Sequence, residues 1–154
     1  MQSFQNAKAG DIVLSMAERI IENRAYLSEI DGKIGDGDHG VNMAKGFGMA
    51  ADRLRGQDAS LAEALDTLGT VLMTEIGGSM GPLYGVMFTE FAEKIENAEA
   101  IDAASFSGML HAGLEGVASI GSAKVGDKTL MDTLVPAVTA FDVAIASGSS
   151  SDSV

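Results

Sequence analysis

Apolar residues recur at helical spacing along almost the whole chain, and this periodicity narrows the possible folds more than any other feature. Apolar residues three or four positions apart form one face of an α-helix, so the stripes predict about six helices. We find no convincing strand-like alternation and no internal repeat. The stripes consist of Ile12, Met16, Ile20, Leu27 and Ile30; Ala44, Phe47, Ala51 and Leu54; Leu61, Leu65, Leu68, Leu72 and Ile76; Tyr84, Met87, Phe88, Phe91 and Ile95; Phe106, Met109, Leu110, Leu114, Val117 and Ile120; and Leu134, Val138, Phe141 and Ile145. The sequence therefore predicts an all-α fold.

Several helix boundaries carry local signals. Ser60 and Glu63 have the spacing of a capping box at the start of a helix. Pro82 suits the first turn of the next helix, where its missing N–H has no intrahelical partner to lose. The last helix is predicted to begin near residue 127 or 129. Pro136 would then lie about two turns inside that helix and should kink it.

The length of 154 residues predicts a single domain, which we place at residues 1–146. The remaining residues, 147–154, read SGSSSDSV and are expected to form a disordered serine-rich tail. The chain has no cysteine, which excludes disulfides and thiolate metal sites. No run of residues is long and apolar enough to cross a membrane, and the N-terminus lacks the pattern of a secretory signal. A cytoplasmic location is the simplest expectation.

The net charge argues against polyanionic partners. Ten lysine and arginine residues face 22 aspartate and glutamate residues, for a formal net charge of −12. Nucleic acids and anionic membrane surfaces reward a basic surface, so we expect neither as a partner. If the chain binds an anion such as a nucleotide, bound cations or backbone N–H groups must provide much of the attraction.

The unusual residues gather in three predicted connections, at residues 31–42, 76–85 and 121–130. A helical barrel or bundle whose loops meet at one rim would bring these connections together. The first connection lies within IDGKIGDGDHGVNM, residues 30–43, which contains three aspartates and four glycines. Asp31 should lie at the end of the first helix, and Asp36 and Asp38 flank Gly37.

Carboxylates this close together repel one another unless a cation collects their charge. Oxygen ligands without thiolates favour a hard ion such as Mg²⁺ or Ca²⁺. A solvated Asp-Gly turn would also suit this composition, and the spacing alone leaves both interpretations open. An EF-hand is excluded, because a calcium loop that began at Asp36 would place Gly40, Val41 and Phe47 where it needs a ligand, a glycine and a glutamate.

The motifs in the other two connections are weaker evidence for a binding site when each is taken alone. IGGSMGPLYG, residues 76–85, could hold a phosphate at the start of a helix or could be a glycine-rich turn. GSAKVGDKT, residues 121–129, is not a P-loop, because Asp127 separates its glycine from Lys128 and no strand precedes it. Its plain interpretation is a helix connection capped by Asp127. His39 could donate to a phosphate or serve a local structural role, and His111 is expected to be structural.

Taken together, IGDGDHGVNM, GGSMGPLYG and GDKTLMDTLVP resemble the nucleotide-binding L subunits of bacterial dihydroxyacetone kinase in order and interval. The resemblance runs from the first helix to about residue 145. It implies an antiparallel helical barrel of the L-subunit type, with about six of the usual eight helices present. It also implies that ADP or ATP binds at one end of the barrel through two Mg²⁺ ions.

The resemblance assigns a role to each connection. Asp31, Asp36 and Asp38 would be the metal ligands. The second connection would contact the nucleotide, and the third would border the adenine. The implied nucleotide-binding residues are His39, Gly40, Val41, Asn42, Gly78, Ser79, Met80, Gly121 and Leu130.

The same resemblance implies a division of labour between subunits. A phosphohistidine on a phosphotransferase-system partner would convert bound ADP to ATP. The ATP would phosphorylate dihydroxyacetone that a histidine of the K subunit holds covalently. No catalytic nucleophile is therefore expected in this chain, which would be inactive without its partners.

One departure from the family pattern concerns the C-terminus. Family members continue with two further helices and a glycine- and arginine-containing loop over the nucleotide. Without these two helices, we expect apolar faces to be exposed, through which two chains could pair as a homodimer. Without the loop that covers the nucleotide, we expect ADP to be exchangeable. The alternatives are a shortened, non-catalytic binding or regulatory module and a subunit of a kinase for another small ketose such as erythrulose.

Overall fold

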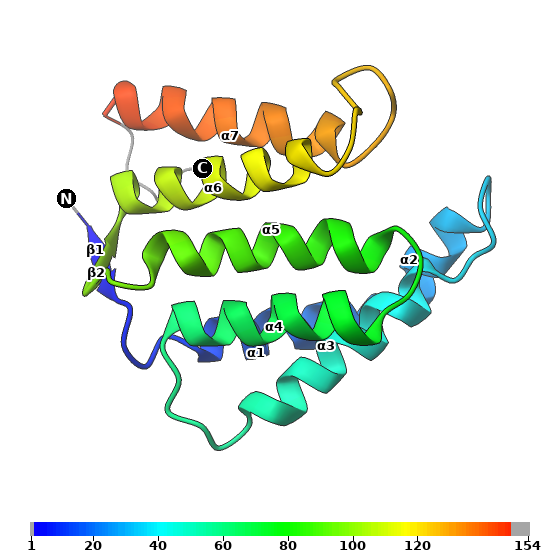
Figure 1. Ribbon diagram of the computed structural model, residues 1–154, viewed down its shortest axis with the longest axis horizontal. Coiled ribbons are helices and arrows are strands. Elements are labelled where there is room, and N and C mark those ends of the chain that lie inside the picture. Colours follow the sequence, from blue (N-terminus) through cyan, green and yellow to red (C-terminus); the bar gives the residue numbers. More distant parts are fainter. Residues whose placement is uncertain (1, 149–154) are drawn as a thin grey trace.

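The computed structural model describes residues 2–148, which form seven helices and one pair of short strands (Figure 1). The all-α prediction is confirmed, although the small sheet was not foreseen. The last helix ends at Ala146, and the first two residues of the predicted tail, Ser147 and Gly148, form a turn after it. The rest of the predicted tail, residues 149–154, lies outside the described residues. The elements in chain order are β1 (Ser3–Gln5), α1 (Asp11–Glu22), α2 (Arg24–Asp31), α3 (His39–Leu54), α4 (Leu61–Glu75), α5 (Met80–Ile95), β2 (Ala100–Asp102), α6 (Ala103–Ser119) and α7 (Met131–Ala146).

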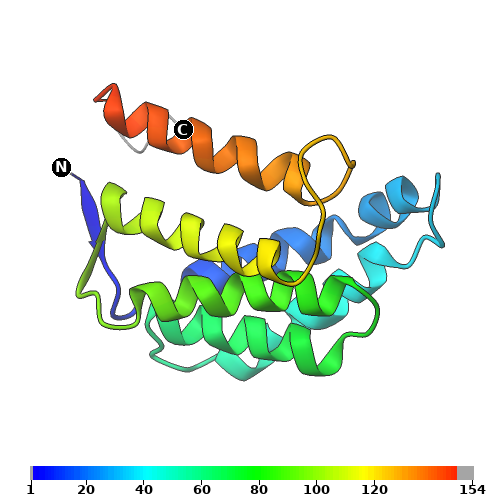
Figure 2. The same ribbon diagram turned by 45° about the horizontal axis from the view of Figure 1, so that its top comes forward.

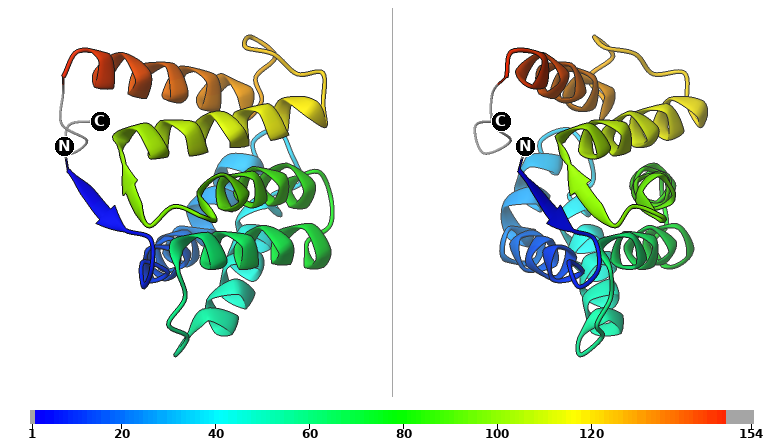
Figure 3. Two further views of the ribbon diagram at one scale, coloured as in Figure 1. Left: turned by 60° about the vertical axis from the view of Figure 1, so that its left-hand side comes forward. Right: turned by 90° about the vertical axis from the view of Figure 1, so that its left-hand side faces the viewer.

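The long helices lie side by side with alternating direction (Figures 1 and 2). Each helix from α3 to α7 packs on the next one, and α1 lies against α3 and α4. Seen end-on, the helices follow one another in a curved row rather than in flat layers (Figure 3). This arrangement places the α2–α3, α4–α5 and α6–α7 connections at one end of the molecule. Within residues 2–148, no helix is long and apolar enough to span a membrane.

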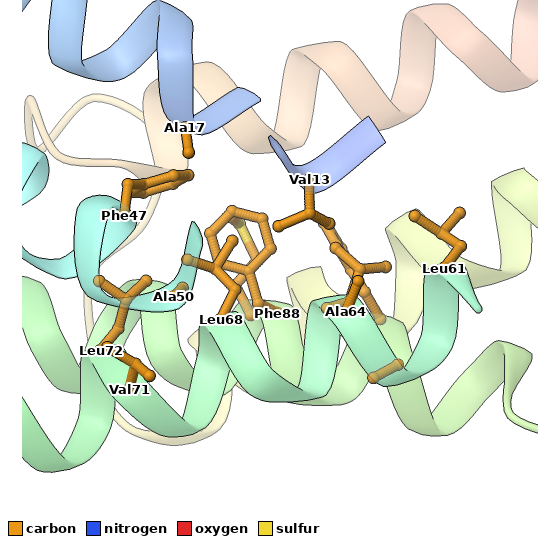
Figure 4. Packing of buried hydrophobic residues seen from close by; sticks show 14 of the residues in the cluster. Val13, Ala17, Phe47, Ala50, Leu61, Ala64, Leu68, Val71, Leu72 and Phe88 are labelled. Atoms are coloured by element: carbon orange, nitrogen blue, oxygen red, sulfur yellow. The ribbon is translucent and has the colours of Figure 1, made fainter. Parts of the chain in front are cut away.

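The core forms where α1, α3, α4 and α5 meet (Figure 4). Phe47 of α3 packs edge-on against Phe88 of α5, with 5.9 Å between the ring centroids, a favourable aromatic arrangement. Leu68 and Leu72 of α4 are fully buried beside them. Burying side chains of this size contributes about 1.5–3 kcal/mol each, so this cluster fixes the packing of the four helices.

The apolar stripe over residues 12–30 divides into two helices at Asn23. This residue has φ −93° and ψ 9°, outside helical geometry, and its amide donates to the Arg19 carbonyl at 2.8 Å. Asparagine competes for backbone groups in this way, which disfavours it inside a helix. Asp31 is the last residue of α2, so its expected position at a helix end is confirmed.

Other boundary predictions have mixed outcomes. The capping box at Ser60 and Glu63 is present, and the hydrogen bonds that Ser60 donates lower the pKa of the Glu63 carboxyl. The prediction that Asp127 caps the last helix is wrong. Asp127 accepts from the Lys124 N–H, and Asp132 accepts from the Thr129 N–H at 2.9 Å beside the helix start. The last helix therefore begins at Met131, later than predicted.

Helix α7 is joined to the body mainly through α6. Val138 and Phe141 of α7 are buried on this side. Asp142 of α7 accepts hydrogen bonds from Ser107 at 2.6 Å and pairs with His111 at 2.7 Å, both on α6. These hydrogen bonds lower the pKa of the Asp142 carboxyl, so this tie weakens as the pH falls through that lowered pKa. Pairing with Asp142 gives His111 the structural role expected for it. The predicted kink at Pro136 stays a prediction.

Strand β1 pairs with β2 antiparallel, with Phe4 opposite Ile101, and Asn6 secures this end of the fold. Asn6 is a buried polar residue, and its amide nitrogen donates to the carbonyls of Ile95 and Ala98 at 2.9 Å each. Its amide oxygen accepts from the Ala62 N–H at 3.2 Å. One side chain thus joins the N-terminal segment, the start of α4 and the end of α5.

We expect Asn6→Ala to lower the free energy of unfolding by about 3 kcal/mol, because it leaves buried backbone groups without a partner. Chemical denaturation followed by circular dichroism measures the change. Asn23→Ala is the matched control, since Asn23 is exposed between α1 and α2 and its side-chain amide donates to the Arg19 carbonyl rather than joining distant segments. Surface substitutions of that kind change stability by at most about 0.5 kcal/mol. Equal losses in the two variants would contradict the role given to Asn6.

Candidate metal and nucleotide site

The α2–α3 connection folds back on the end of α2. The N–H groups of Ile34 and Gly35 both donate to the Asp31 carbonyl, at 3.2 and 2.6 Å. Gly37 has φ +78°, a conformation that favours glycine, and it lies between Asp36 and Asp38. The compact turn therefore brings residues from the two ends of the connection close together.

The three predicted metal ligands meet in this turn. One carboxylate oxygen from each of Asp31, Asp36 and Asp38 lies within 4.8 Å of the other two. Asp31 is half-buried, whereas Asp36 and Asp38 are exposed. Within residues 2–148, none of the three forms an ion pair with a lysine, arginine or histidine. The protein thus gathers three negative charges without neutralising them through these contacts.

Neighbouring hydrogen bonds orient the carboxylates. The His39 N–H, at the start of α3, donates to Asp31 Oδ2 at 3.2 Å. The Asn42 amide donates to Asp38 Oδ2 at 2.8 Å, and the Asp38 N–H donates to Asp36 Oδ1 at 3.3 Å. The positive end of the α3 dipole also favours negative charge here. Each carboxylate keeps an oxygen free of these three bonds, as a ligand of a hard cation requires.

The donor set fits Mg²⁺. Carboxylate oxygens are its preferred protein ligands, and it usually keeps several waters and phosphate oxygens as further ligands. Two of the carboxylates are exposed, so water and phosphate can reach the cluster. An Asp-Gly turn without metal would need no such convergence of three carboxylates, although exposed acidic groups can also gather without a cation.

Residues 39–42 form the first turn of α3 and meet different surroundings. Gly40 is buried against α2, where a Cβ would clash with the Arg24 carbonyl and lie 2.6 Å from Ser28 Oγ. Val41 is 43% exposed and faces away from the core. The family resemblance assigned both residues to the nucleotide, but Gly40 has an evident packing role. Its predicted nucleotide contact is untested.

His39 lies beside a groove that the sequence patterns did not predict. Its ring centroid is 6.3 Å from that of Tyr84 on α5. Burial raises the pKa of the Tyr84 hydroxyl. Both rings line a largely apolar groove of about 680 Å³ between α1, α3 and α5. The helical stripe had placed Tyr84 on the inner face of its helix, which gave no sign of a contact with His39.

The second and third connections lie at the same end of the fold as the acidic cluster (Figures 1 and 2). Gly78 has φ +74°, and Ser79 is the N-cap residue of α5, with no side-chain capping bond. Met80 packs into the core. Gly121 is exposed in the α6–α7 connection, and Leu130 is a half-buried residue just before α7. The fold thus brings all three predicted connections to one rim, while Met80 presents its side chain to the interior.

Comparison with known proteins agrees with this arrangement. Residues 33–154 match the DAK2 domain. The chain is 41% identical over 116 residues to the ADP-binding subunit of a PTS-dependent dihydroxyacetone kinase from Lactococcus lactis, covering 75% of this chain and 58% of that protein. It is 38% identical over 125 residues to the ADP-binding subunit of PEP-dependent dihydroxyacetone kinase 1 from Listeria innocua, covering 80% and 63%. The chain thus spans about three fifths of the length of these relatives.

A solved structure has a similar fold. It is the dihydroxyacetone kinase from Citrobacter freundii in complex with AMP-PNP and Mg²⁺, which matches with a TM-score of 0.71 and 30% sequence identity. The match covers 90% of this chain and 26% of the larger protein. The helical arrangement found here therefore also occurs in a protein crystallised with a nucleotide analogue and magnesium.

We expect Asn42→Ala to weaken Mn²⁺ binding, because Asp38 would lose the amide that orients it. Loss of such an outer hydrogen bond lowers metal affinity by about 10-fold or more. Titration of the protein with Mn²⁺, with free ion measured by electron paramagnetic resonance, gives the affinity. Asn97→Ala is the control, since Asn97 is exposed in the α5–β2 connection, far along the chain from the cluster. Unchanged Mn²⁺ affinity in Asn42→Ala would contradict the orienting role.

Proposed function

This chain belongs to the DAK2 domain family, and we propose that it is the nucleotide-binding subunit of a phosphotransferase-linked dihydroxyacetone kinase. The observation that carries the proposal is the convergence of Asp31, Asp36 and Asp38 at one end of the fold, where the α4–α5 and α6–α7 connections also lie. The ADP-binding relatives and the magnesium–nucleotide complex of a similar fold support it.

Asp31, Asp36 and Asp38 would hold two Mg²⁺ ions against the phosphates of ADP or ATP. When bound, magnesium neutralises the charge on the phosphates and orients the phosphoryl group that is transferred. A chain with a net charge of −12 needs such a mediator, because its own field repels a nucleotide. The uncompensated carboxylates provide the sites for these cations.

The remaining predicted residues would surround the nucleotide. His39, Gly40, Val41 and Asn42 lie in the first turn of α3 beside the carboxylates, where the positive end of the helix dipole favours phosphate oxygens. Gly78 and Ser79 precede α5 at the same rim, and Met80 would contribute through its backbone. Gly121 and Leu130 would border the adenine from the α6–α7 connection.

The chain would act by positioning rather than by forming a covalent intermediate. We assign no nucleophile to it, which is consistent with phosphoryl transfer through charge neutralisation and alignment. Dihydroxyacetone would be held by a histidine of a separate K subunit, and a phosphohistidine on a further subunit would regenerate ATP. The description of relatives as subunits of PEP- or PTS-dependent kinases supports this assembly.

Two alternatives differ from this proposal in what they predict. A non-catalytic family member could bind nucleotide yet fail to support sugar phosphorylation by any K subunit. A kinase for another small ketose would bind nucleotide in the same way, because the sugar site would lie on the partner. Nucleotide binding therefore tests the shared basis of all three, and the ketose is decided by the partner.

We expect ADP to bind this chain only in the presence of a divalent cation. Calorimetric titration of ADP into the protein with Mg²⁺ should give a measurable affinity that EDTA abolishes. Asp36→Asn should weaken the Mg²⁺-dependent affinity at least about 10-fold, since it removes one of three shared carboxylate ligands and one negative charge. Asp58→Asn is the control, because Asp58 is an exposed aspartate in the α3–α4 connection, beyond the other end of α3 from the cluster, and pairs with Lys8. Equal ADP affinity in Mg²⁺ and in EDTA would refute the proposed function.

A further inference from the structure

Gly35 occupies a position where a side chain would meet one of the proposed metal ligands. It lies four residues after Asp31, in the turn that leads to Asp36. A Cβ atom on Gly35 would clash with Asp31 Oδ1 and would lie 3.1 Å from Asp31 Cγ and from the Asp31 carbonyl oxygen. No other glycine in the described residues has a ligand carboxylate as its nearest obstacle.

Glycine is favoured at position 35 because a side chain would clash with Asp31, and not because the backbone conformation requires glycine. Gly35 does not have a positive φ, whereas Gly37 in the same turn has φ +78°. An alanine at 35 could therefore adopt the observed backbone. The nearest obstacle is the end of a side chain, which can turn. The Asp31 carbonyl oxygen, at 3.1 Å, would need to move by only a few tenths of an ångström.

The Asp31 carboxylate is held on both sides. Its Oδ2 accepts the His39 N–H at 3.2 Å, and its Oδ1 faces Gly35. Movement of Oδ1 away from a methyl group at 35 rotates the carboxylate. That rotation disturbs either the bond to His39 or the approach to Asp36 and Asp38 that keeps one oxygen of each within 4.8 Å.

We propose that Gly35 is a positioning residue of the metal site, which leaves room for the orientation of Asp31 that lets it share a cation with Asp36 and Asp38. The inference rests on the proposed function, in which these carboxylates bind Mg²⁺. Gly35 itself donates no ligand. Its N–H donates to the Asp31 carbonyl at 2.6 Å, so the same residue also closes the turn on α2.

The inference predicts a specific loss of metal binding. A methyl group at 35 should lower the affinity for Mn²⁺ in the presence of ADP by about 10- to 100-fold, the range seen when residues that orient metal ligands are changed. The thermal midpoint of the metal-free protein should change little, since only the half-buried carboxylate of Asp31 turns and no core contact is lost.

The experiment compares Gly35→Ala with Gly77→Ala. Gly77 lies in the α4–α5 connection at the same rim, has no positive φ, and has nothing within 4 Å of a Cβ built on it. Both variants replace a glycine in a loop at this end of the fold, but only the methyl group of Gly35→Ala would contact a proposed metal ligand, Asp31. The readouts are Mn²⁺ affinity by electron paramagnetic resonance with ADP present and the thermal midpoint without metal.

A double-mutant cycle with Asp31→Ala distinguishes action through Asp31 from a general distortion of the loop. Gly35→Ala should weaken binding in the wild-type background and cause no further loss in the Asp31→Ala background, where Oδ1 is absent. Gly77→Ala should bind Mn²⁺ as the wild type does. This pattern would establish the positioning role.

The outcomes separate the inference from the proposed function. If the wild type binds no Mn²⁺ with ADP, the proposed function fails and the inference fails with it. If the wild type binds and Gly35→Ala binds equally well, the inference alone is overturned. Equal losses in both backgrounds, a similar loss in Gly77→Ala, or unfolding of Gly35→Ala at the assay temperature would each overturn it as well.

Discussion

Mutual repulsion among three carboxylates is the constraint on which this structure depends most. Asp31, Asp36 and Asp38 each place an oxygen within 4.8 Å of the others, and none has a basic partner among the described residues. Charges at such distances repel by about 1 kcal/mol even in bulk water and by more near a protein surface. Hydrogen bonds must therefore hold them together: the His39 N–H donates to Asp31, and the side-chain amide of Asn42 donates to Asp38.

Two helix ends contribute opposite fields to this cluster. Asp31 is the last residue of α2, where the helix dipole disfavours an anion, whereas His39 begins α3, where it favours one. The bond from the His39 N–H to Asp31 places the carboxylate on the favourable side. Gly40 lets α2 and α3 approach closely enough for this bond, because a Cβ would clash with the Arg24 carbonyl. The orientation of the Asp31 carboxylate thus depends on the close packing of α2 and α3.

Local patterns predicted much of the fold and the acidic part of the site. The capping box at Ser60 and the cluster of Asp31, Asp36 and Asp38 each depend on residues close in sequence, so local patterns could indicate them. The spacing of the aspartates left a metal site and a solvated turn both open, and only the family resemblance implied the metal. The pairing of β1 with β2 and the buried role of Asn6 join segments about 90 residues apart, and no local pattern encodes them. The break at Asn23 was hidden because the apolar stripe continues through it.

The outer parts of the site were harder to predict for a similar reason. Asp132 rather than Asp127 accepts the N–H groups before α7, and both aspartates have plausible spacing. Tyr84 meets His39 only because α3 and α5 converge around the groove, which requires the tertiary packing. Met80 fits a helix start next to a phosphate site, yet its side chain enters the core. The roles of the nucleotide-contact residues stay predictions.

The central claim is that the three carboxylates share bound cations with a nucleotide. Crystals grown with Mn²⁺ and ADP test it most directly, because the anomalous scattering of manganese locates the ion independently of any assumption about the ligands. The account predicts anomalous density in contact with the carboxylates of Asp31, Asp36 and Asp38, and ADP phosphate oxygens on the same ions. Bound ADP with no manganese at these three residues would contradict it.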